Sequence, residues 1–368
     1  MGLKKTTMTI QTELKSINKL AQRLPAPVQF MEVCGTHTMA VFRSGLISLL
    51  PENVKLLSGP GCPVCVTEDS FIDKAIALAQ QPGVIVTTFG DMLRVPGSHQ
   101  SSEQARAGGA AFRVVYSPLD ALKLARENTD KHVVFLGIGF ETTAPTIGWT
   151  IRQAAEEKID NYSVLCAHKT MPYAMAGLLT DQELKIDGFL CPGHVSVIIG
   201  SNAYEPLADQ FKTPCVIAGF EAGDVAGGIR MLLEQVTEKR AGVENEYVRS
   251  VTPAGNTSAQ EVISTVFEEA DASWRGLGVI PNSGLAIRKE FGRHDADRRF
   301  PDLDLPPPQE HKGCRCGDVL RGTCTPPECS LFGKACTPET PVGACMVSIE
   351  GTCSAYYKYG HGRNSRLV

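Results

Sequence analysis

The chain has 368 residues, and its 43% share of hydrophobic residues predicts a folded protein of two or three domains, not a disordered one. The formal net charge is −4 and Lys and Arg are scattered, so no basic stripe is available for a nucleic-acid backbone. The basic N-terminus leads into polar residues, and no apolar run approaches the length of a membrane span. We therefore expect a cytoplasmic protein that binds neither nucleic acid nor membrane.

The pattern along the chain predicts alternating strands and helices. Apolar residues at helical spacing predict an opening helix over residues 9–24, which stops before Pro25. Short apolar runs that end in small-residue loops predict buried strands at 54–57, 84–86, 114–116, 133–136, 164–165, 189–190 and 216–218. Helix-like stretches lie between them at 68–80, 118–127, 146–157, 172–179 and 223–235. This alternation implies right-handed crossovers and parallel sheets, so the predicted fold class is α/β.

A short repeat suggests how the α/β part is divided. The sequence Gly-Phe-Glu occurs at 139–141 and again at 219–221, which indicates two related parallel-sheet α/β domains. We place these domains at residues 1–150 and 151–300. A proline-rich connector follows, so residues 301–368 are expected to form a small third domain.

The first cysteine of interest opens the motif Cys34-Gly-Thr-His37, directly after the apolar stretch 28–33. This position is expected at a strand end or at the start of a helix, and a helix N-terminus would lower the pKa of the Cys34 thiol and favour the thiolate. His37 can orient or deprotonate that sulfur, or bind the same metal. The alternative is a small buried cysteine beside a structural histidine.

A second thiol motif is Cys62-Pro-Val-Cys65, which lies in a glycine-rich loop after a predicted strand. The spacing lets the two sulfurs form a reducible disulfide or share a metal ion. In a cytosolic protein such a pair is more typical of redox chemistry than of a structural disulfide, and the sequence has no second CxxC to complete a zinc ribbon, so redox chemistry is favoured over zinc binding here. Three further cysteines, Cys166, Cys191 and Cys215, fall within apolar strands, which is typical of buried, unreactive thiols.

The C-terminal 55 residues hold seven of the thirteen cysteines: Cys314, Cys316, Cys324, Cys329, Cys336, Cys345 and Cys353. The segment has too few apolar residues to build a core of its own, so a metal centre is expected to supply the missing stability. The spacing fits neither a zinc ribbon nor the tight run of a bacterial ferredoxin. Thiolate ligands suit both metals, so the pattern leaves iron and zinc open.

These motifs together resemble the HypD family of hydrogenase maturation proteins. The resemblance runs from about residue 28 to 360 and rests on these segments: Cys34-Gly-Thr-His37, Gly59-Pro-Gly-Cys62-Pro-Val-Cys65, Thr88-Phe-Gly-Asp91-Met, Gly139-Phe-Glu-Thr-Thr-Ala-Pro145, Cys191-Pro-Gly-His194-Val-Ser, Cys336-Thr-Pro, Gly343-Ala-Cys345-Met-Val-Ser and Gly351-Thr-Cys353-Ser-Ala-Tyr-Tyr-Lys. It implies a three-domain α/β protein whose C-terminal part binds a [4Fe-4S] cluster.

The resemblance also implies a function and a set of partners. The protein would be a scaffold that, with the small chaperone HypC, holds an iron ion while cyanide and carbon monoxide are attached. HypE would supply the cyanide, and the finished Fe(CN)2CO group, a transient cargo, would reach the large subunit of a [NiFe] hydrogenase through HypC.

The resemblance assigns roles to individual residues. Cys34 would bind the cargo iron, and Cys62 and Cys65 would cycle between dithiol and disulfide with the cluster as electron relay. The expected cluster ligands are Cys329, Cys336, Cys345 and Cys353, with Cys314 or Cys316 able to replace one of them. Four further residues are expected to line the cleft by hydrogen bonding or proton transfer: His37, Asp91, Glu141 and His194. The alternatives are a stand-alone iron-sulfur-dependent protein disulfide reductase and a zinc-stabilised binding module.

Overall fold

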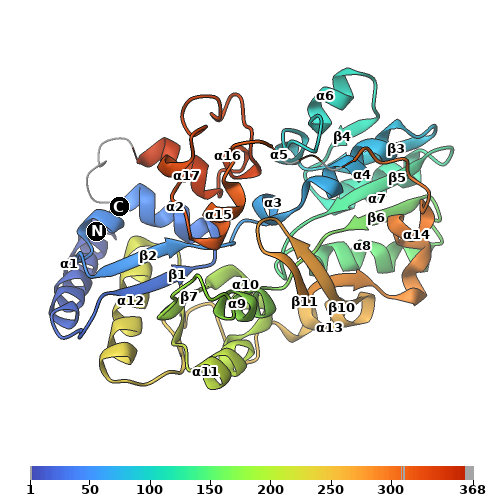
Figure 1. Cartoon of the computed structure of the whole chain (residues 1–368). Coiled ribbons are helices and arrows are strands. Elements are labelled where there is room, and N and C mark those ends of the chain that lie inside the picture. The colour runs from blue at the N-terminus through green and yellow to red at the C-terminus, as the bar shows by residue number, and fades with distance from the viewer. Residues whose placement is uncertain (1, 308, 310, 361–368) are drawn as a thin grey trace.

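The computed structural model describes residues 2–307, 309 and 311–360, and it has two parallel sheets flanked by helices and a cysteine-rich C-terminal segment (Figure 1). The α/β class and the parallel pairing predicted from the alternation of elements are confirmed. In the described part of the chain, no helix combines the length and the apolar character that crossing a membrane requires.

The first sheet has five strands in the order β2-β1-β7-β8-β9. Their bounds are β1 Val28–Glu32, β2 Val54–Ser58, β7 Gly188–Pro192, β8 Cys215–Ala218 and β9 Val243–Asn245, and every neighbouring pair is parallel. Alternate residues point to opposite faces, so Phe30 and Leu190 pack in a different core cluster from Met31 and Phe189. Both faces are therefore covered, which is why these strands are apolar along their whole length.

The second sheet has four strands in the order β4-β3-β5-β6. Their bounds are β3 Val84–Thr88, β4 Phe112–Val114, β5 His132–Gly137 and β6 Tyr162–Cys166. Helices α4 (Asp69–Gln80), α7 (Pro118–Glu127) and α8 (Ala144–Glu157) cover its faces. The strand predicted at 114–116 lies two residues earlier, because Ser117 caps α7 and Tyr116 is already outside the sheet and exposed.

The two sheets do not follow the order of the sequence. The five-stranded sheet takes β1 and β2 from before the four-stranded sheet and β7, β8 and β9 from after it. The boundary placed at residue 150 falls inside α8, and the chain passes between the sheets twice. Parallel pairing explains this arrangement, since β1 lies between β2 and β7 and joins the two parts of one sheet.

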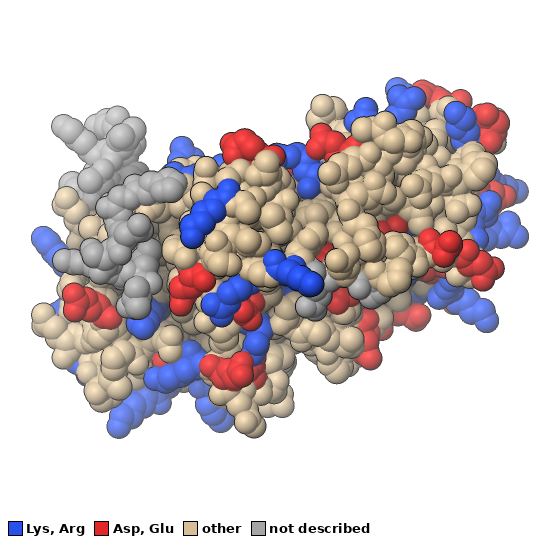
Figure 2. Space-filling model, turned by 45° about the horizontal axis from the view of Figure 1, so that its top comes forward, with Lys and Arg blue, Asp and Glu red and all other residues tan. Residues whose placement is uncertain are grey.

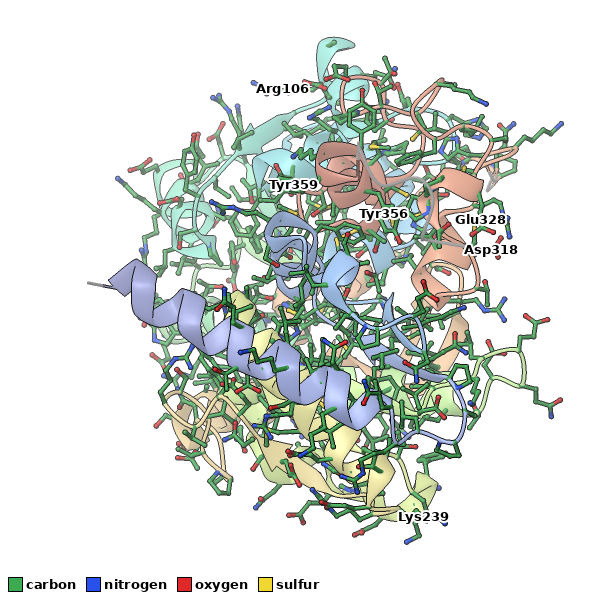
Figure 3. All side chains as sticks on the ribbon, turned by 90° about the vertical axis from the view of Figure 1, so that its left-hand side faces the viewer. Arg106, Lys239, Asp318, Glu328, Tyr356 and Tyr359 are labelled. Carbon is green, nitrogen blue, oxygen red and sulfur yellow. A yellow bond between two sulfur atoms is a disulfide. The ribbon has the colours of Figure 1, made fainter. Side chains whose placement is uncertain are left out.

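Helices α1 (Gly2–Ala21) and α12 (Ala222–Thr237) pack together on the first sheet, and Figure 3 shows α1 crossing in front of α12. The predicted opening helix ends three residues earlier than expected, at Ala21, ahead of the turn that leads to Pro25. The other helices before the C-terminal segment are α2 Gly35–Ser44, η1 Leu46–Leu49, α3 Pro63–Val66, α5 Gly90–Leu93, α6 Ser102–Ala107, α9 Met171–Leu179, α10 Gly193–Ile199, η2 Ser201–Tyr204, α11 Glu205–Phe211, α13 Thr257–Val266, η3 Lys289–His294 and α14 Ala296–Arg299.

An antiparallel hairpin of β10 (Phe267–Trp274) and β11 (Gly278–Ile287) was not predicted. Polar residues, Gly and Pro interrupt the apolar residues of both strands, and several positions are exposed, so the strands lack the long apolar runs that mark the buried strands. Figure 1 shows the tip of this hairpin beside α3, between the two sheets.

The C-terminal segment contains α15 (Cys316–Arg321), η4 (Pro326–Glu328), α16 (Ala344–Val347) and α17 (Thr352–Tyr359). It packs back on the N-terminal part of the chain: the ring of Tyr356 lies 4.3 Å from that of Phe42 on α2, and α16 and α15 contact α3 (Figures 1 and 3). The last eight residues of the predicted third domain, 361–368, lie outside the described residues. On the face in Figure 2, acidic and basic side chains are interspersed.

Candidate functional site

Cys34 lies where β1 passes into α2, as the position after an apolar stretch predicted. Its side chain is 8% exposed, and its backbone N–H donates to the Glu32 carboxylate at 3.0 Å. The glycine loop before Cys62 lies against this turn, since Gly35 N–H donates to Gly61 O at 3.0 Å. A Cβ on Gly61 would overlap the backbone N and Cα of Cys34, so only glycine allows the two thiol motifs to approach this closely.

Burial raises the pKa of the Cys34 thiol to about 12, and the nearby carboxylates of Glu350 and Glu32 add to the rise. The N–H groups of His37 and Thr36, at the start of α2, lower the pKa, but burial outweighs them. The expectation that the helix N-terminus makes Cys34 a thiolate is therefore wrong for the chain by itself. A metal cation at the sulfur would reverse the balance, because a coordinating thiol is deprotonated.

Two carboxylates that we did not predict flank Cys34. Glu32 is buried, accepts a hydrogen bond from Thr38 Oγ as well as from Cys34 N–H, and has a pKa that burial raises to about 8. Glu350 comes from the C-terminal segment, and its Oε1 accepts a hydrogen bond from Thr36 Oγ at 2.7 Å. A charged residue inside the apolar stretch 28–33 was a signal for Glu32, whereas nothing local in the sequence pointed to Glu350.

His37 and His194 lie on either side of one aromatic ring. The ring centroid of Phe220 is 4.9 Å from that of His37 and 3.9 Å from that of His194. His37 Nε2 donates to the carbonyls of Ala218 and Gly219 at 3.1 and 3.0 Å, while its buried Nδ1 has no hydrogen-bond partner among the described residues. Burial lowers the pKa of His37 to about 4 and lowers that of His194 as well, so both rings are expected to be neutral near pH 7.

Asp91 and Glu141 are not part of this group. Asp91 is exposed on the short helix α5, which follows β3 of the four-stranded sheet. Glu141 is buried, and its Oε1 accepts a hydrogen bond from the N–H of Met171, the first residue of α9, at 2.9 Å. In the part of the chain that the structure describes, neither carboxylate bonds to Cys34, His37 or His194. Burial raises the pKa of Glu141 to about 7, and its position at the start of a helix indicates a structural role.

Cys62 and Cys65 form a disulfide across the first turn of α3. Both residues are buried, and they belong to the same core cluster as Cys316 and Cys345 of the C-terminal segment. The redox pair inferred from the CxxC spacing therefore lies against the cysteine-rich segment, a proximity that sequence spacing does not reveal.

The C-terminal cysteines gather in one pocket. Six of the seven line it, namely Cys314, Cys316, Cys329, Cys336, Cys345 and Cys353, and Cys324 lies outside it, with its thiol donating to Thr325 O at 3.2 Å. The sulfurs of Cys316 and Cys345 are 3.0 Å apart. The hydrogen bond with Cys345 is the largest cause that lowers the pKa of Cys316 to about 7, and the same contact raises that of Cys345.

The other four pocket cysteines lie close to this pair and to one another. Burial raises the pKa of Cys314, and the charges of Cys316 and, more weakly, of Cys329 and Cys336 add to the rise. Burial also raises the pKa of Cys336, with smaller contributions from Cys353 and Cys329. No three His, Cys, Asp or Glu side chains within the described ranges already converge closely enough to hold a single metal ion. The donor set is nevertheless all thiol, which is the set that iron-sulfur clusters use. The pocket thus fits a thiolate-bound cluster better than a site with oxygen or nitrogen ligands.

Comparisons with known proteins give a consistent match over nearly the whole chain. The HypD family model, described as "Hydrogenase formation hypA family", matches residues 8–360. The chain is 49% identical over 344 residues to hydrogenase maturation factor HypD of Azotobacter vinelandii, covering 92% of this chain and 90% of that protein. It is 48% identical to the HypD proteins of Cupriavidus necator, with 95% and 97% covered, and of Escherichia coli K12, with 90% and 89% covered.

Proposed function

Since the chain belongs to the HypD family of hydrogenase maturation factors, we propose that it is the scaffold on which the Fe(CN)2CO group of a [NiFe] hydrogenase is assembled. HypC would bind with it, HypE would supply the cyanide, and HypC would pass the iron group to the hydrogenase large subunit in the cytoplasm. The observation that carries this proposal is the placement of Cys34 between Glu32 and Glu350 and against the Cys62–Cys65 loop.

The iron ion is cargo, and Cys34 is the residue that we propose binds it. A soft thiolate suits iron that carries cyanide and carbon monoxide. The surrounding groups support such a complex. Cys34 itself is nearly closed to water, and buried His37 presents a neutral ring near it. His194, which is more exposed, stacks on the other side of Phe220 and is also expected to be neutral. Binding of the cation would release the Cys34 proton. Glu32 beside it could take up this proton only in its minor ionised form near pH 7, because burial raises the pKa of Glu32 to about 8, so most of the released protons would pass to solvent.

The pocket of the C-terminal segment would hold a [4Fe-4S] cluster. We propose Cys314, Cys329, Cys336 and Cys353 as its ligands, because all four line the pocket while the sulfurs of the other two lining cysteines, Cys316 and Cys345, pair with each other at 3.0 Å. This set keeps three of the ligands expected from the sequence and replaces Cys345 by Cys314. When bound, the cluster would supply single electrons.

Two thiol pairs then lie between the cluster and the iron site. Cys345 also contacts Cys353, and α15 and α16, which carry Cys316 and Cys345, both pack on the α3 helix of the Cys62–Cys65 disulfide. Exchange between the pairs is balanced without another reagent: Cys316 and Cys345 give up two electrons and two protons and become a disulfide, and Cys62–Cys65 takes them up and becomes a dithiol. Reduced Cys62 and Cys65 would be available beside Cys34.

Infrared spectroscopy of the complex with HypC tests the scaffold function. The wild-type complex, purified from cells that make the other maturation proteins, is expected to show the isolated cyanide and carbon monoxide stretches. The Cys34→Ala complex is expected to lack them and still to contain HypC. A wild-type complex without these bands, with reversible disulfide chemistry retained, would instead favour the stand-alone disulfide reductase.

A further inference from the structure

A second cavity lies where the β10–β11 hairpin faces the end of β6 and the start of α4. Its volume is about 320 Å³, at the lower end of the range for small-molecule sites. Among the described residues, neither Cys34 nor a cysteine of the C-terminal segment lines it. The segment that carries Lys169 is fixed here, because the Lys169 N–H donates to Gly139 O at 3.0 Å. The proposed function uses no part of this cavity.

Lys169 is the unusual member of the lining. It is 5% exposed, yet no carboxylate among the described residues forms an ion pair with it. Its Nζ donates to Ser273 O at 2.6 Å and lies 5.5 Å from the centre of the Trp274 ring. An ammonium has three N–H donors, and a lysine this buried is almost always paired, so these contacts leave a charged Lys169 incompletely satisfied. A neutral amine, with two donors and one lone pair, suits the position better.

The charges around the cavity favour a neutral amine over a bound anion. Burial lowers the pKa of Lys169 to about 8, and the charge of Glu68 opposes this only in part. The other titratable and charged groups that line the cavity come from every element around it: Glu68 and Lys74 from the start of α4, Asp271 from β10, Asp295 and Asp297 from the start of α14, and Cys166 and His168 from the segment of Lys169. Four carboxylates against two lysines repel an anion, so we expect no anionic ligand to supply the missing counter-charge.

The neighbouring thiol is the weaker nucleophile near neutral pH. Burial raises the pKa of Cys166 to about 12, so the thiol stays protonated. Its Sγ donates to Leu285 O at 3.1 Å and lies 3.3 Å from His168 Nδ1. Burial lowers the pKa of His168 to about 3, so its ring is neutral, and its buried Nε2 has no hydrogen-bond partner among the described residues. That nitrogen is available to a polar group of a ligand.

We propose that Lys169 is a nucleophilic residue and that this cavity binds a small uncharged hydroxyaldehyde. The lone pair of Nζ attacks the carbonyl carbon, the nitrogen gives up its two protons, and the carbonyl oxygen leaves as water, so an imine forms without a change in oxidation state. The carboxylates of the lining and His168 Nε2 would hold the hydroxyl groups of the aldehyde by hydrogen bonds. The site is independent of the iron and cluster sites, so its failure would leave the proposed function untouched.

The test is reductive labelling of the full-length protein, kept anaerobic, with glyceraldehyde and sodium cyanoborohydride, which reduces the imine to a stable secondary amine. Peptide mass spectrometry measures the rate of labelling at each lysine. At pH 7 about a tenth of an amine with a pKa of about 8 is unprotonated, against roughly one part in 2,500 of an ordinary exposed lysine. Because burial slows access, we expect Lys169 to be labelled at least about tenfold faster than exposed Lys55. The ratio of the two rates should fall as the pH rises above about 8, where the Lys169 amine is already largely unprotonated.

Lys74 provides the matched control, because it lines the same cavity but pairs with Asp297 at 2.6 Å. It should be labelled no faster than Lys55, and Lys74→Gln should leave the rate at Lys169 within about twofold of wild type. Glu68→Gln removes the charge that favours the ammonium, so it should raise the rate at Lys169 about threefold at pH 7. Lys169→Arg should lose this adduct while circular dichroism shows the wild-type fold.

Two results would overturn different parts of the proposal. Labelling of Lys169 no faster than that of Lys55, or a ratio of the two rates that does not change with pH, would overturn the nucleophilic role. A higher ratio with glyoxylate, an anionic aldehyde, than with glyceraldehyde would overturn the uncharged class of ligand.

Discussion

The close approach of the Cys34 turn and the glycine loop can be tested at Gly61. In Gly61→Ala the new methyl group would meet the backbone N and Cα of Cys34 and, at 2.5 Å, the carbonyl carbon of Val33. Backbone atoms in a buried turn cannot rotate away as a side chain can, so the loop must move. Overpacking of this kind costs about 1–3 kcal/mol. The shift also endangers the hydrogen bond from Gly35 N–H to Gly61 O, worth about 1 kcal/mol.

The reduced entropy of the unfolded alanine chain returns about 0.4–1 kcal/mol. The expected net loss for Gly61→Ala is therefore about 1–3.5 kcal/mol in the free energy of unfolding. Gly90→Ala is the control, because its methyl group would meet only Val114 Cγ1, at 3.9 Å, and it should stay within about 1 kcal/mol of wild type. Urea unfolding followed by circular dichroism measures both, and the rate of Cys34 alkylation should rise only in Gly61→Ala. Equal unfolding midpoints and equal alkylation rates for the two variants would refute the proposed contact.

Three further predictions concern the cluster, the aromatic ring and a buried acid. Cys314→Ser should lower the iron and sulfide content of anaerobically purified protein well below about four of each per chain. Cys324→Ser is the control, because Cys324 lies outside the pocket, and it should leave both contents unchanged. A fully loaded Cys314→Ser protein would show that Cys314 is not a ligand and would favour Cys345 as the fourth one. Phe220→Ala should destabilise the chain by about 1–2 kcal/mol, less than the loss of a fully buried Phe because this ring is half-buried. It should also raise the pKa of His194, measured by NMR titration, because the ring that shields this histidine is removed; an unchanged pKa would show that the stacking does not set it. Burial raises the pKa of Glu141 from 4.5 to about 7, so the folded chain favours the neutral form of this carboxyl. The free energy of unfolding of wild type should therefore fall by roughly 3 kcal/mol relative to that of Glu141→Gln as the pH rises from 4.5 to about 7, and should fall no further above that pH. Parallel curves of stability against pH for the two proteins would contradict the raised pKa.

The sequence predicted those parts of the molecule that depend on local patterns. Buried parallel strands are apolar along their length, so most of them were found, and the helix at 118–127 matches α7 because Ser117 and Pro118 mark its start. The β10–β11 hairpin was missed because its stability comes from contacts with α9, β6 and α13, not from an apolar run of its own. Strand order was also beyond local patterns, since β7 returns beside β1 after more than a hundred residues.

The candidate site shows the same division. Cys34 and the Cys62–Cys65 pair were evident from spacing, and the structure brings their motifs into contact through Gly61. Glu350 was not evident, and neither was Arg275, whose guanidinium donates to Cys65 O at 3.0 Å, because each reaches its position from a distant segment and has no motif around it. The helix N-terminus at Cys34 was recognised correctly, but the pKa of the thiol depends on burial and two carboxylates, and neither follows from the local sequence.

The C-terminal segment connects the two chemical centres through a very short stretch of chain. Cys345 lines the thiol pocket at one end of α16, and Glu350, five residues later, accepts the hydrogen bond from Thr36 beside Cys34. A Cβ on Gly35 would overlap Glu350, so the backbone of Gly35 and the residue Glu350 are already as close as packing allows. A shift of α16 when Cys345 changes its bonding would therefore move a carboxylate at the proposed iron site, because a packed backbone transmits displacement. The segment would thus provide a mechanical link, in addition to the proposed exchange between thiol pairs, between the proposed cluster pocket and the environment of Cys34.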